Sequence, residues 1–271
     1  MTKVAFQGER GAFSEDAAIK LFGTDIDFSP CIQLRDVFQA VSEDKVRFGV
    51  VPLENSQAGS INETYDLLLT YPLNIFAEVI LRVSHCLMAL PGEKLDDVRT
   101  IYSHPQALAQ CEEFLSKLKA EIVPSYDTAG SAKMIAEKGL RNCAAIASKR
   151  AAALYGLEIL APEIETSVNN YTKFVAISKQ KAKPARRNKT SLVFAAEHKP
   201  GSLHRILGVF ATRNINLTKL ESRPSRTKPW EYVFYVDFEG HLHDEVCQEA
   251  LKELQREATS IKILGSYPQA T

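Results

Sequence analysis

The stretch that decides the organisation of this chain is Asn169-Asn170-Tyr171-Thr172-Lys173-Phe174, followed directly by Val175-Ala176-Ile177-Ser178. The apolar run from Phe174 to Ser178 predicts a buried strand. The amides, the hydroxyl and the cation before it would lie at the mouth of that strand, where a rigid element can hold a small ligand. We therefore expect a binding site at the start of this strand.

A basic tract follows the strand, running from Lys179 to Lys189 with six Lys or Arg residues and no apolar side chain larger than alanine. This composition favours a solvated linker between domains over a segment that binds an anion or nucleic acid. The sequence therefore predicts a first domain over residues 1–178, a linker over 179–189 and a second domain over 190–271.

The second predicted domain alternates apolar and amphipathic segments in the order βαββαβ, which is the ferredoxin-like pattern. The expected strands are Ser191–Ala196, Leu217–Ser222, Tyr232–Phe238 and Ile261–Leu264, and the expected helices are Leu203–Ala211 and Glu245–Ala258. A tight turn at Pro200-Gly201-Ser202 precedes the first helix, where free backbone N–H groups can hold a carboxylate.

The first predicted domain contains two series of strands followed by helices, which favours a mostly parallel α/β fold. Its strand candidates are Val4–Phe6 and Phe48–Leu53 in the first series, and Thr100–Ser103, Ile122–Val123 and Ala144–Ala147 in the second. An extended run from Leu73 to Leu90 joins the two series. Two lobes joined in this way predict a cleft between them, a common place for small-molecule sites.

Composition excludes several classes of function. The 271 residues are 45% hydrophobic and 24% charged, as in a globular protein, and 33 basic residues balance 33 acidic ones. No net field would recruit nucleic acid or a membrane, and no apolar segment approaches the ~20 residues of a membrane span. The five cysteines are scattered without zinc-ligand spacing, and no signal region precedes the first strand. We expect a metal-free cytoplasmic protein.

Three further blocks place polar residues where a strand ends and a helix begins. They are Val51–Ser56 with Gly59–Thr64, Ser103–Leu108, and Asp127–Ala132. Hydroxyl, amide and backbone N–H groups at such a junction suit an oxygen-rich anion. Each block also has a simpler interpretation, in which His104 and Asp127 are N-terminal caps and the other polar residues form turns.

The order of these blocks resembles the prephenate dehydratase family, in which a dehydratase domain precedes a regulatory ACT domain. The resemblance extends from Val4 through Tyr232–Phe238. The matching segments are Gln7-Gly8 with Gly11–Ser14, Pro52–Ser56 with Gly59-Ser60, Ser103–Gln106, Asp127–Gly130, Asn170–Phe174, Gly201–Leu203 and Glu221–Pro224. One position departs from the family pattern, because Lys173 stands where the family has arginine.

The resemblance implies a two-lobed catalytic domain like a periplasmic binding protein, whose last strand returns to the first lobe. It implies a carbon–oxygen lyase of phenylalanine biosynthesis that converts prephenate to phenylpyruvate with loss of water and carbon dioxide, without a cofactor. Arogenate dehydratase, the same elimination on the amino analogue, is the nearer alternative. A non-catalytic two-lobed sensor of small molecules with an ACT module is the alternative of another class.

The resemblance also implies the site residues. Thr172 would be the catalytic hydroxyl, with Asn170 and Lys173 binding or polarising the substrate. Lysine offers a compact point charge where arginine grips a carboxylate with two parallel bonds, so Lys173 would keep the charge with looser orientation or mark a different substrate preference. The expected substrate contacts are Glu54, Asn55, Ser56, Ser60, Ser103, Gln106, Thr128, Ser131 and Phe174.

For the second domain, the resemblance implies an allosteric site for L-phenylalanine where two ACT domains pair, and hence feedback inhibition. The residues that match this site are Gly201, Ser202, Leu203, Asn216, Leu217, Glu221, Ser222 and Arg223. We expect a homodimer or homotetramer assembled through the ACT domains, because so small a domain should bury apolar surface against a partner.

Overall fold

The computed structural model describes residues 1–225 and 232–270. The chain forms two compact units. Unit 1 comprises Met1–Thr64 and Val79–Phe174, and unit 2 comprises Tyr65–Glu78 and the chain from Val175 onward. Unit 2 therefore takes a segment, Tyr65–Glu78, from inside the first predicted domain.

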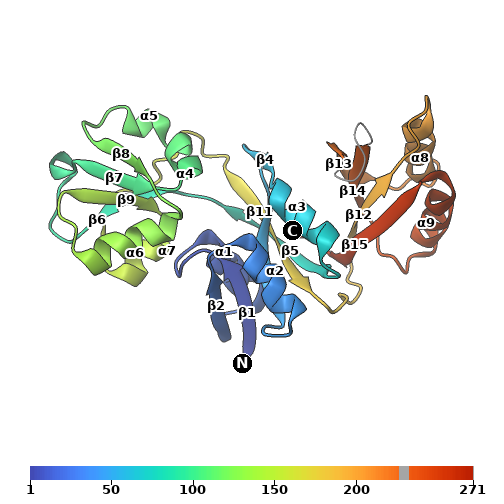
Figure 1. Ribbon diagram of the computed structural model, residues 1–271, viewed down its shortest axis with the longest axis horizontal. Helices are drawn as coiled ribbons and strands as arrows, with labels where there is room; N and C mark the ends of the chain where they lie inside the picture. The colour runs from blue at the N-terminus through green and yellow to red at the C-terminus, as the bar shows by residue number, and fades with distance from the viewer. Residues whose placement is uncertain (226–231, 271) are drawn as a thin grey trace. The chain divides into compact units, whose positions relative to one another are not determined.

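The first lobe is built on a mixed sheet with the strand order β2-β1-β3-β11-β5, and β4 pairs with β3 (Figure 1). Its strands are β1 (Thr2–Gln7), β2 (Ile26–Cys31), β3 (Phe48–Asn55), β4 (Gly59–Ser60), β5 (Asn74–Arg82) and β11 (Tyr171–Ser178), and its helices are α1 (Phe13–Phe22), α2 (Leu34–Ser42) and α3 (Asn62–Thr70). Strand β1 runs parallel to both β2 and β3. The returning last strand that the resemblance implied is β11, which lies beside β3.

The second lobe of unit 1 is a sheet with helices on both faces. Its strands have the order β10-β6-β9-β7-β8, and β7 is parallel to β8 and β9. The strands are β6 (Cys86–Ala89), β7 (Thr100–Ser103), β8 (Glu121–Pro124), β9 (Cys143–Ala147) and β10 (Glu158–Ala161), and the helices are α4 (Pro105–Gln110), α5 (Glu112–Leu115), α6 (Thr128–Lys138) and α7 (Lys149–Tyr155), with a 3-10 turn at Leu95–Asp97.

Strand β9 shows why both faces of that sheet are covered. Ala145 and Ala147 pack with α6 and α7, whereas Ala144 and Ile146 pack with α4 and α5. Successive side chains of a strand point to opposite faces, so a continuous apolar run must be buried on both sides. The two-lobed α/β prediction is confirmed.

Unit 2 contains the ferredoxin-like sheet that the sequence predicted. The antiparallel strands have the order β13-β14-β12-β15, and α8 and α9 pack on one face through a core that includes Phe194, Phe210 and Phe238 (Figure 1). The elements are β12 (Asn188–Ala195), α8 (Ser202–Ala211), β13 (Leu217–Pro224), β14 (Tyr232–Glu239), α9 (Glu245–Glu257) and β15 (Ser260–Pro268). Because β12 begins at Asn188, the basic tract ends two residues earlier than expected.

The other face of this sheet packs against Tyr65–Glu78. The rings of Tyr65 and Tyr235 meet edge to face with their centroids 4.7 Å apart. A Cβ atom on Gly265 would lie 2.4 Å from the carbonyl oxygen of Ile75, so only glycine fits where the two backbones approach. These contacts explain why Tyr65–Glu78 belongs to unit 2.

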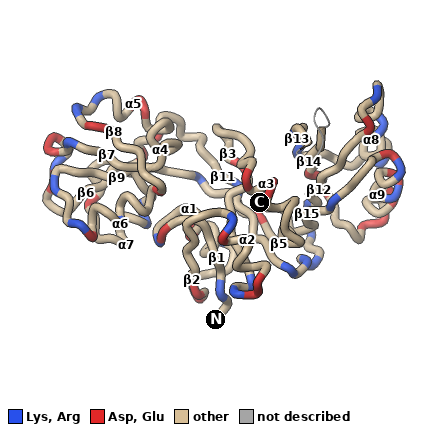
Figure 2. Tube along the Cα trace, viewed as in Figure 1, with Lys and Arg blue, Asp and Glu red and all other residues tan. Residues whose placement is uncertain are grey.

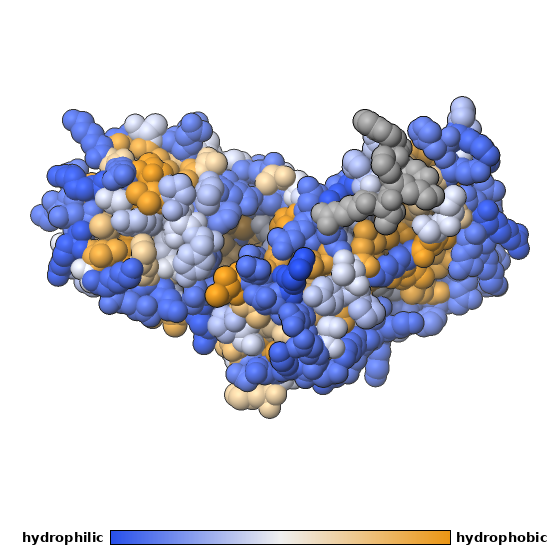
Figure 3. Space-filling view, in the orientation of Figure 1, coloured by the Kyte–Doolittle hydropathy of each residue, from blue (hydrophilic) through white to orange (hydrophobic). Residues whose placement is uncertain are grey.

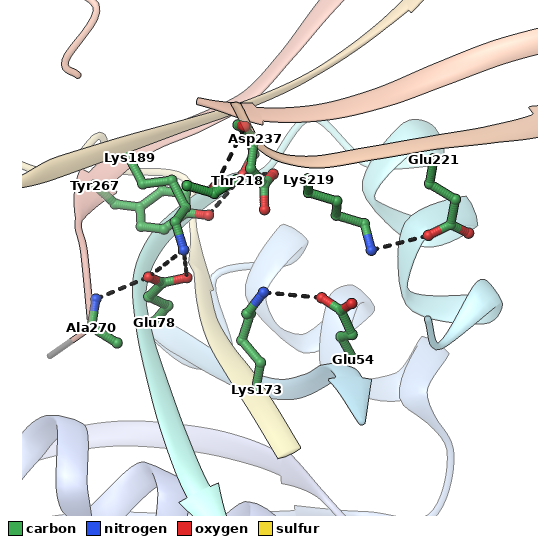
Figure 4. Close-up of polar contacts among 11 residues, drawn as sticks. Glu54, Glu78, Lys173, Lys189, Thr218, Lys219, Glu221, Asp237, Tyr267 and Ala270 are labelled. Carbon is green, nitrogen blue, oxygen red and sulfur yellow. Dashed lines mark hydrogen bonds and ion pairs between the residues drawn. The ribbon is translucent and has the colours of Figure 1, made fainter. Parts of the chain in front are cut away.

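Five residues with polar side chains are buried at the same face of the sheet (Figure 4). We call them the Glu78 cluster; they are Glu78, Lys189, Ser191, Asp237 and Tyr267. Lys189 Nζ lies 2.7 and 2.9 Å from the two carboxylate oxygens of Glu78. Ser191 Oγ contacts both Asp237 Oδ1 and the Tyr267 hydroxyl. Burial and the neighbouring carboxylates raise the pKa of Tyr267, which therefore stays protonated.

Charges of both signs are spread over the described residues. Lys and Arg alternate with Asp and Glu along the elements of each unit (Figure 2). Hydrophilic residues cover most of the surface seen in Figure 3, and the apolar residues between them form small separate patches. No helix of the described residues is long and apolar enough to cross a bilayer.

Candidate active site

A cavity of about 270 Å³ lies between the two lobes of unit 1. Residues from the ends of β1 and β2, the starts of α1, α4 and α6, and strand β11 form its walls. Its polar or charged lining residues include Gln7, Glu9, Ser14, Asn55, His85, His104, Gln106, Gln110, Tyr126, Asp127, Thr128 and Thr172. The apolar lining includes Phe13, Ile32, Pro52, Ile61, Val83 and Phe174.

The cavity suits an anion although the described residues that line it include no lysine or arginine. Ala12, Ile61 and Asp127 directly precede helices α1, α3 and α6 and contribute to the wall. The first N–H groups of a helix are unpaired, and the peptide dipoles make this end positive. The starts of α1 and α3, together with neutral amide side chains, can hold carboxylate groups, whereas the start of α6 is already capped by the Asp127 carboxylate.

Thr172 is held by Asn55 in one orientation. The Asn55 Oδ1 atom accepts from the backbone N–H groups of Gln57 and Ala58, each at 3.0 Å. The Asn55 Nδ2 atom therefore faces the other way and donates to Thr172 Oγ1 at 2.9 Å. Because its oxygen accepts this bond, Thr172 keeps its own hydroxyl proton for a ligand in the cavity that it lines.

The hydrogen bonds continue behind Thr172. Asn55 Nδ2 also donates to Asn170 Oδ1 at 2.8 Å, and Asn170 Nδ2 donates to Gln110 Oε1 at 2.9 Å. We call Thr172, Asn55, Asn170 and Gln110 the amide chain. Asn170 is completely buried, so it positions its neighbours from behind the cavity wall.

Lys173 points away from Thr172. Adjacent residues of a strand face opposite sides, and Thr172 lines the cavity whereas Lys173 does not belong to its described lining. Lys173 Nζ lies 3.0 Å from Glu54 Oε2, and Glu54 also lies outside the lining (Figure 4). The sequence predicted that both residues act at the substrate, and that role stays a prediction; in the structure they form an ion pair in the first lobe.

The other expected substrate contacts divide into two groups. The residues that line the cavity are Asn55, Gln106, Thr128 and Phe174. The residues that lie outside its described lining are Ser56, Ser60, Ser103 and Ser131.

The hydroxyl groups of three of these serines have partners in the surrounding structure. Ser103 Oγ donates to the carbonyl of Ile146, and Ser131 Oγ to that of Asp127. Ser56 Oγ donates to the carbonyl of Asn169. These serines hold strands and helix starts in place, which is the simpler interpretation of the polar blocks.

Two N-terminal caps predicted from the sequence are present. His104 Nδ1 accepts from the backbone N–H of Gln106 at the start of α4, and Asp127 Oδ2 accepts from that of Gly130 in α6. Asp127 Oδ2 also accepts from the backbone N–H of Glu9 at 2.9 Å, which joins the two lobes.

Glu9 makes further contacts across the lobes. Lys133 Nζ lies 3.0 Å from Glu9 Oε2, and the Tyr126 hydroxyl donates to Glu9 Oε1 at 3.3 Å. A Cβ atom on Gly130 would lie 2.5 Å from the Tyr126 hydroxyl, so the small residue leaves room for the ring. Glu9 and Tyr126 both line the cavity, and their contacts fix one side of its wall.

Gln110 and His85 line the cavity but were missed by sequence reasoning. Gln110 could have been found, because it lies four residues after Gln106 and so on the same face of α4. His85 has no such signal, since it lies in the connection between β5 and β6 and its side-chain partner is Gln110.

The residues expected to bind phenylalanine lie on α8 and β13 or directly before them. Gly201 precedes α8 with a φ of 80°, and Ser202 is buried. Strand β13 is an edge strand, on which Arg223 pairs with Asp66 at 3.3 Å. A hollow of about 380 Å³ lies beside the start of α8. Of the expected residues only Leu203 belongs to its described lining, which otherwise includes Ala196–Pro200, Tyr232 and Phe234.

Comparison with known proteins gives the class of this fold and site. The family model described as prephenate dehydratase matches residues 4–182, and the ACT domain model matches residues 190–256. The arogenate dehydratase/prephenate dehydratase 2 of Arabidopsis thaliana, a chloroplastic protein, is 46% identical over 99% of this chain and 73% of its own length. The bifunctional chorismate mutase/prephenate dehydratase of Aquifex aeolicus (strain VF5) is 40% identical over 99% of this chain and 74% of its own.

Solved structures agree over the whole chain. The prephenate dehydratase of Arthrobacter aurescens in complex with L-Phe is 32% identical with a TM-score of 0.90, covering 99% of this chain and 90% of that one. GqqA, described as a novel type of quorum quenching acylase, is 35% identical with a TM-score of 0.88, covering 99% and 98%.

The class defined by these observations is a two-lobed lyase followed by an ACT domain. The chain belongs to the prephenate dehydratase family. The family and the order of its two domains, inferred from the motifs, are confirmed.

Proposed function

We propose that this chain converts prephenate to phenylpyruvate. The C1–carboxylate bond breaks and carbon dioxide leaves. The electron pair of the broken bond makes the ring aromatic and expels the hydroxyl group from C4. This hydroxyl group takes up one proton and leaves as water. The observation that carries the proposal is the Asn55–Thr172 hydrogen bond, because it leaves a hydroxyl proton directed to a ligand in the cavity.

Thr172 would donate a hydrogen bond to the departing C4 oxygen. A threonine hydroxyl is too weak an acid to act alone, so a preoriented donor that stabilises developing negative charge is the chemistry it can supply. The helix starts at Ala12 and Ile61 would hold the two carboxylates in alignment. Gln106, Thr128 and Phe174 are the further proposed contacts, because they line the same cavity.

The experiment is to incubate purified protein with prephenate and to measure phenylpyruvate. Arogenate is the matched control, since the relative from Arabidopsis thaliana is named for both activities. We expect a higher kcat/KM on prephenate. A higher value on arogenate would make the chain an arogenate dehydratase. Acylase activity without phenylpyruvate formation would favour the activity named for GqqA instead.

We further propose that phenylalanine binds the ACT domain and inhibits dehydration, in a cytoplasmic homodimer or homotetramer. The supporting observations are the turn at Gly201, the edge strand β13 and the similar protein solved with L-Phe. Calorimetry on Asn216→Trp tests the site, because the Asn216 side chain is exposed and only its backbone carbonyl bonds to Glu239. Unchanged phenylalanine affinity in this variant would contradict the proposed site. A monomer by light scattering would contradict the proposed homodimer or homotetramer.

A further inference from the structure

His85 is a buried histidine in the wall of the cavity, and the residue is only 2% exposed. Its backbone N–H donates to Glu165 Oε2 at 2.9 Å, and its ring meets Phe13 edge to face with centroids 5.6 Å apart. The ring is therefore fixed on two sides before any ligand binds. Its Nε2 atom lies 2.9 Å from Gln110 Oε1.

The amide chain determines which ring nitrogen of His85 carries the proton. Backbone N–H groups fix Asn55 Oδ1 as an acceptor, so Asn55 Nδ2 must donate to Asn170 Oδ1. Asn170 Nδ2 then donates to Gln110 Oε1. A carboxamide oxygen has no proton to give, so His85 Nε2 must be the donor in its bond to Gln110.

Two residues at the end of the amide chain, His85 and Gln110, keep hydrogen-bonding atoms that the chain does not use. His85 Nδ1 is buried without a hydrogen-bond partner among the described residues. Burial lowers the pKa of His85, against the smaller opposing effects of Gln110 and of Glu165, whose carboxylate is paired with Arg82. The ring is thus neutral. Gln110 Oε1 is held by two donors, no bond to its Nε2 amide is found among the described residues, and Gln110 lines the cavity.

We infer that His85 is a positioning residue for the dehydration: its Nε2–H fixes the Gln110 carboxamide, so that the Gln110 N–H and the Thr172 hydroxyl are presented together to the leaving C4 oxygen. This inference rests on the proposed function. Without the donor at His85, the Gln110 carboxamide could turn over and present its oxygen, which would repel the developing negative charge.

The first test compares two substitutions of similar size. His85→Gln keeps an N–H near the position of Nε2, whereas His85→Leu removes it. We expect His85→Leu to lower kcat by ~10- to 100-fold with KM changed less than ~3-fold, because the lost orientation acts mainly in the transition state. His85→Gln should stay within ~5-fold of wild type. A merely structural role would not produce this division between kcat and KM, nor the rescue.

The second test asks whether His85 acts through Gln110. In a double-mutant cycle, adding His85→Leu to Gln110→Ala should cost less than ~2-fold more than Gln110→Ala alone. Losses that multiply would overturn the inference, as would full activity in His85→Leu. Equal losses in folded His85→Gln and His85→Leu would also overturn it, because the donor would then be irrelevant.

A third measurement needs no turnover and separates this inference from the proposed function. The intact protein is labelled with ¹⁵N-histidine and its NMR spectrum is recorded. The signals that are absent from the spectrum of His85→Gln belong to His85, and they should show a neutral ring protonated at Nε2. A ring protonated at Nδ1 would overturn the inference even in an active enzyme. Absence of phenylpyruvate formation by wild type, with the Nε2–H form present, would instead contradict the proposed function.

Discussion

The amide chain in unit 1 and the Glu78 cluster in unit 2 are both buried polar groups, but they differ in charge and in their relation to the cavity. The Glu78 cluster contains an ion pair: Lys189 contacts both carboxylate oxygens of Glu78, and the backbone N–H of Ala270 adds a further bond at 2.9 Å. The amide chain contains only neutral groups, and its outer members, Thr172 and Gln110, accept within the chain and line the cavity.

The difference indicates which group serves stability and which serves binding. A buried polar atom costs free energy unless it is paired, so a satisfied ion pair such as Lys189–Glu78 can be kept for structure alone. An unsatisfied donor in a cavity wall is tolerated where a ligand completes it. The following predictions test this division, from the largest expected effect to the smallest.

Thr172→Ala should lower kcat by ~10²- to 10⁴-fold, because it removes the donor that the amide chain directs to the ligand. Thr172→Ser keeps the hydroxyl and should retain much more activity. The alanine variant should stay folded with a loss of ~1–3 kcal/mol, since Asn55 loses one acceptor. Phenylpyruvate formation and circular dichroism measure both. Near-normal turnover in folded Thr172→Ala would remove the catalytic role from the amide chain.

Lys189→Met should reduce the free energy of unfolding by ~3–5 kcal/mol, because it leaves the buried Glu78 carboxylate without its cation. The double variant Lys189→Met with Glu78→Leu should recover most of this loss, since no charge is then buried. Denaturant unfolding followed by fluorescence measures the change. If the single variant were as stable as wild type, the Glu78 cluster would not serve the stability of the fold.

Lys173→Ala should reduce kcat/KM by less than ~10-fold, far less than Thr172→Ala, because Lys173 pairs with Glu54 outside the described cavity lining. Lys173→Arg should be close to wild type. Steady-state kinetics on prephenate measures both variants. A loss in Lys173→Ala equal to that in Thr172→Ala would show that the cation reaches the substrate, as the family pattern first indicated.

At pH values above 6, Asp16→Asn should slightly raise the midpoint temperature of thermal unfolding. Near pH 4 it should leave this temperature unchanged. Burial raises the pKa of Asp16 to about 6; the nearby Arg150 lowers it, and Glu15 raises it. The folded state therefore binds the proton more tightly than the unfolded state, whose pKa is near 3.8. This contribution to stability is lost as pH rises from ~4 to ~6. Thermal unfolding of both proteins at several pH values should show the difference, and parallel curves would contradict it.

Much of this molecule could be predicted from the sequence. The alternation of apolar and amphipathic segments indicated both α/β lobes and the ferredoxin-like sheet, and the family motifs located Asn55, Thr128 and Thr172 at one cavity. The opposite directions of Thr172 and Lys173 were also within reach, because adjacent residues of one strand cannot share a face.

The remaining features depend on long-range packing. Asn55 and Asn170 are 115 residues apart, so no local pattern reveals that one orients the other. His85 acts through a residue 25 positions later and on another element. Tyr65–Glu78 has the composition of a helix end and a strand, and only the contacts of Tyr235 and Gly265 show that it packs under the ACT sheet.

The absence of lysine and arginine from the described lining of the cavity has a consequence for how substrate arrives. The potential of a helix start and of an amide falls off more steeply with distance than that of a full charge, and the chain has no net charge to add a long-range field. A dianion in solution is therefore recognised on contact rather than attracted from afar. Its rate of capture should change little as added salt shortens the screening length.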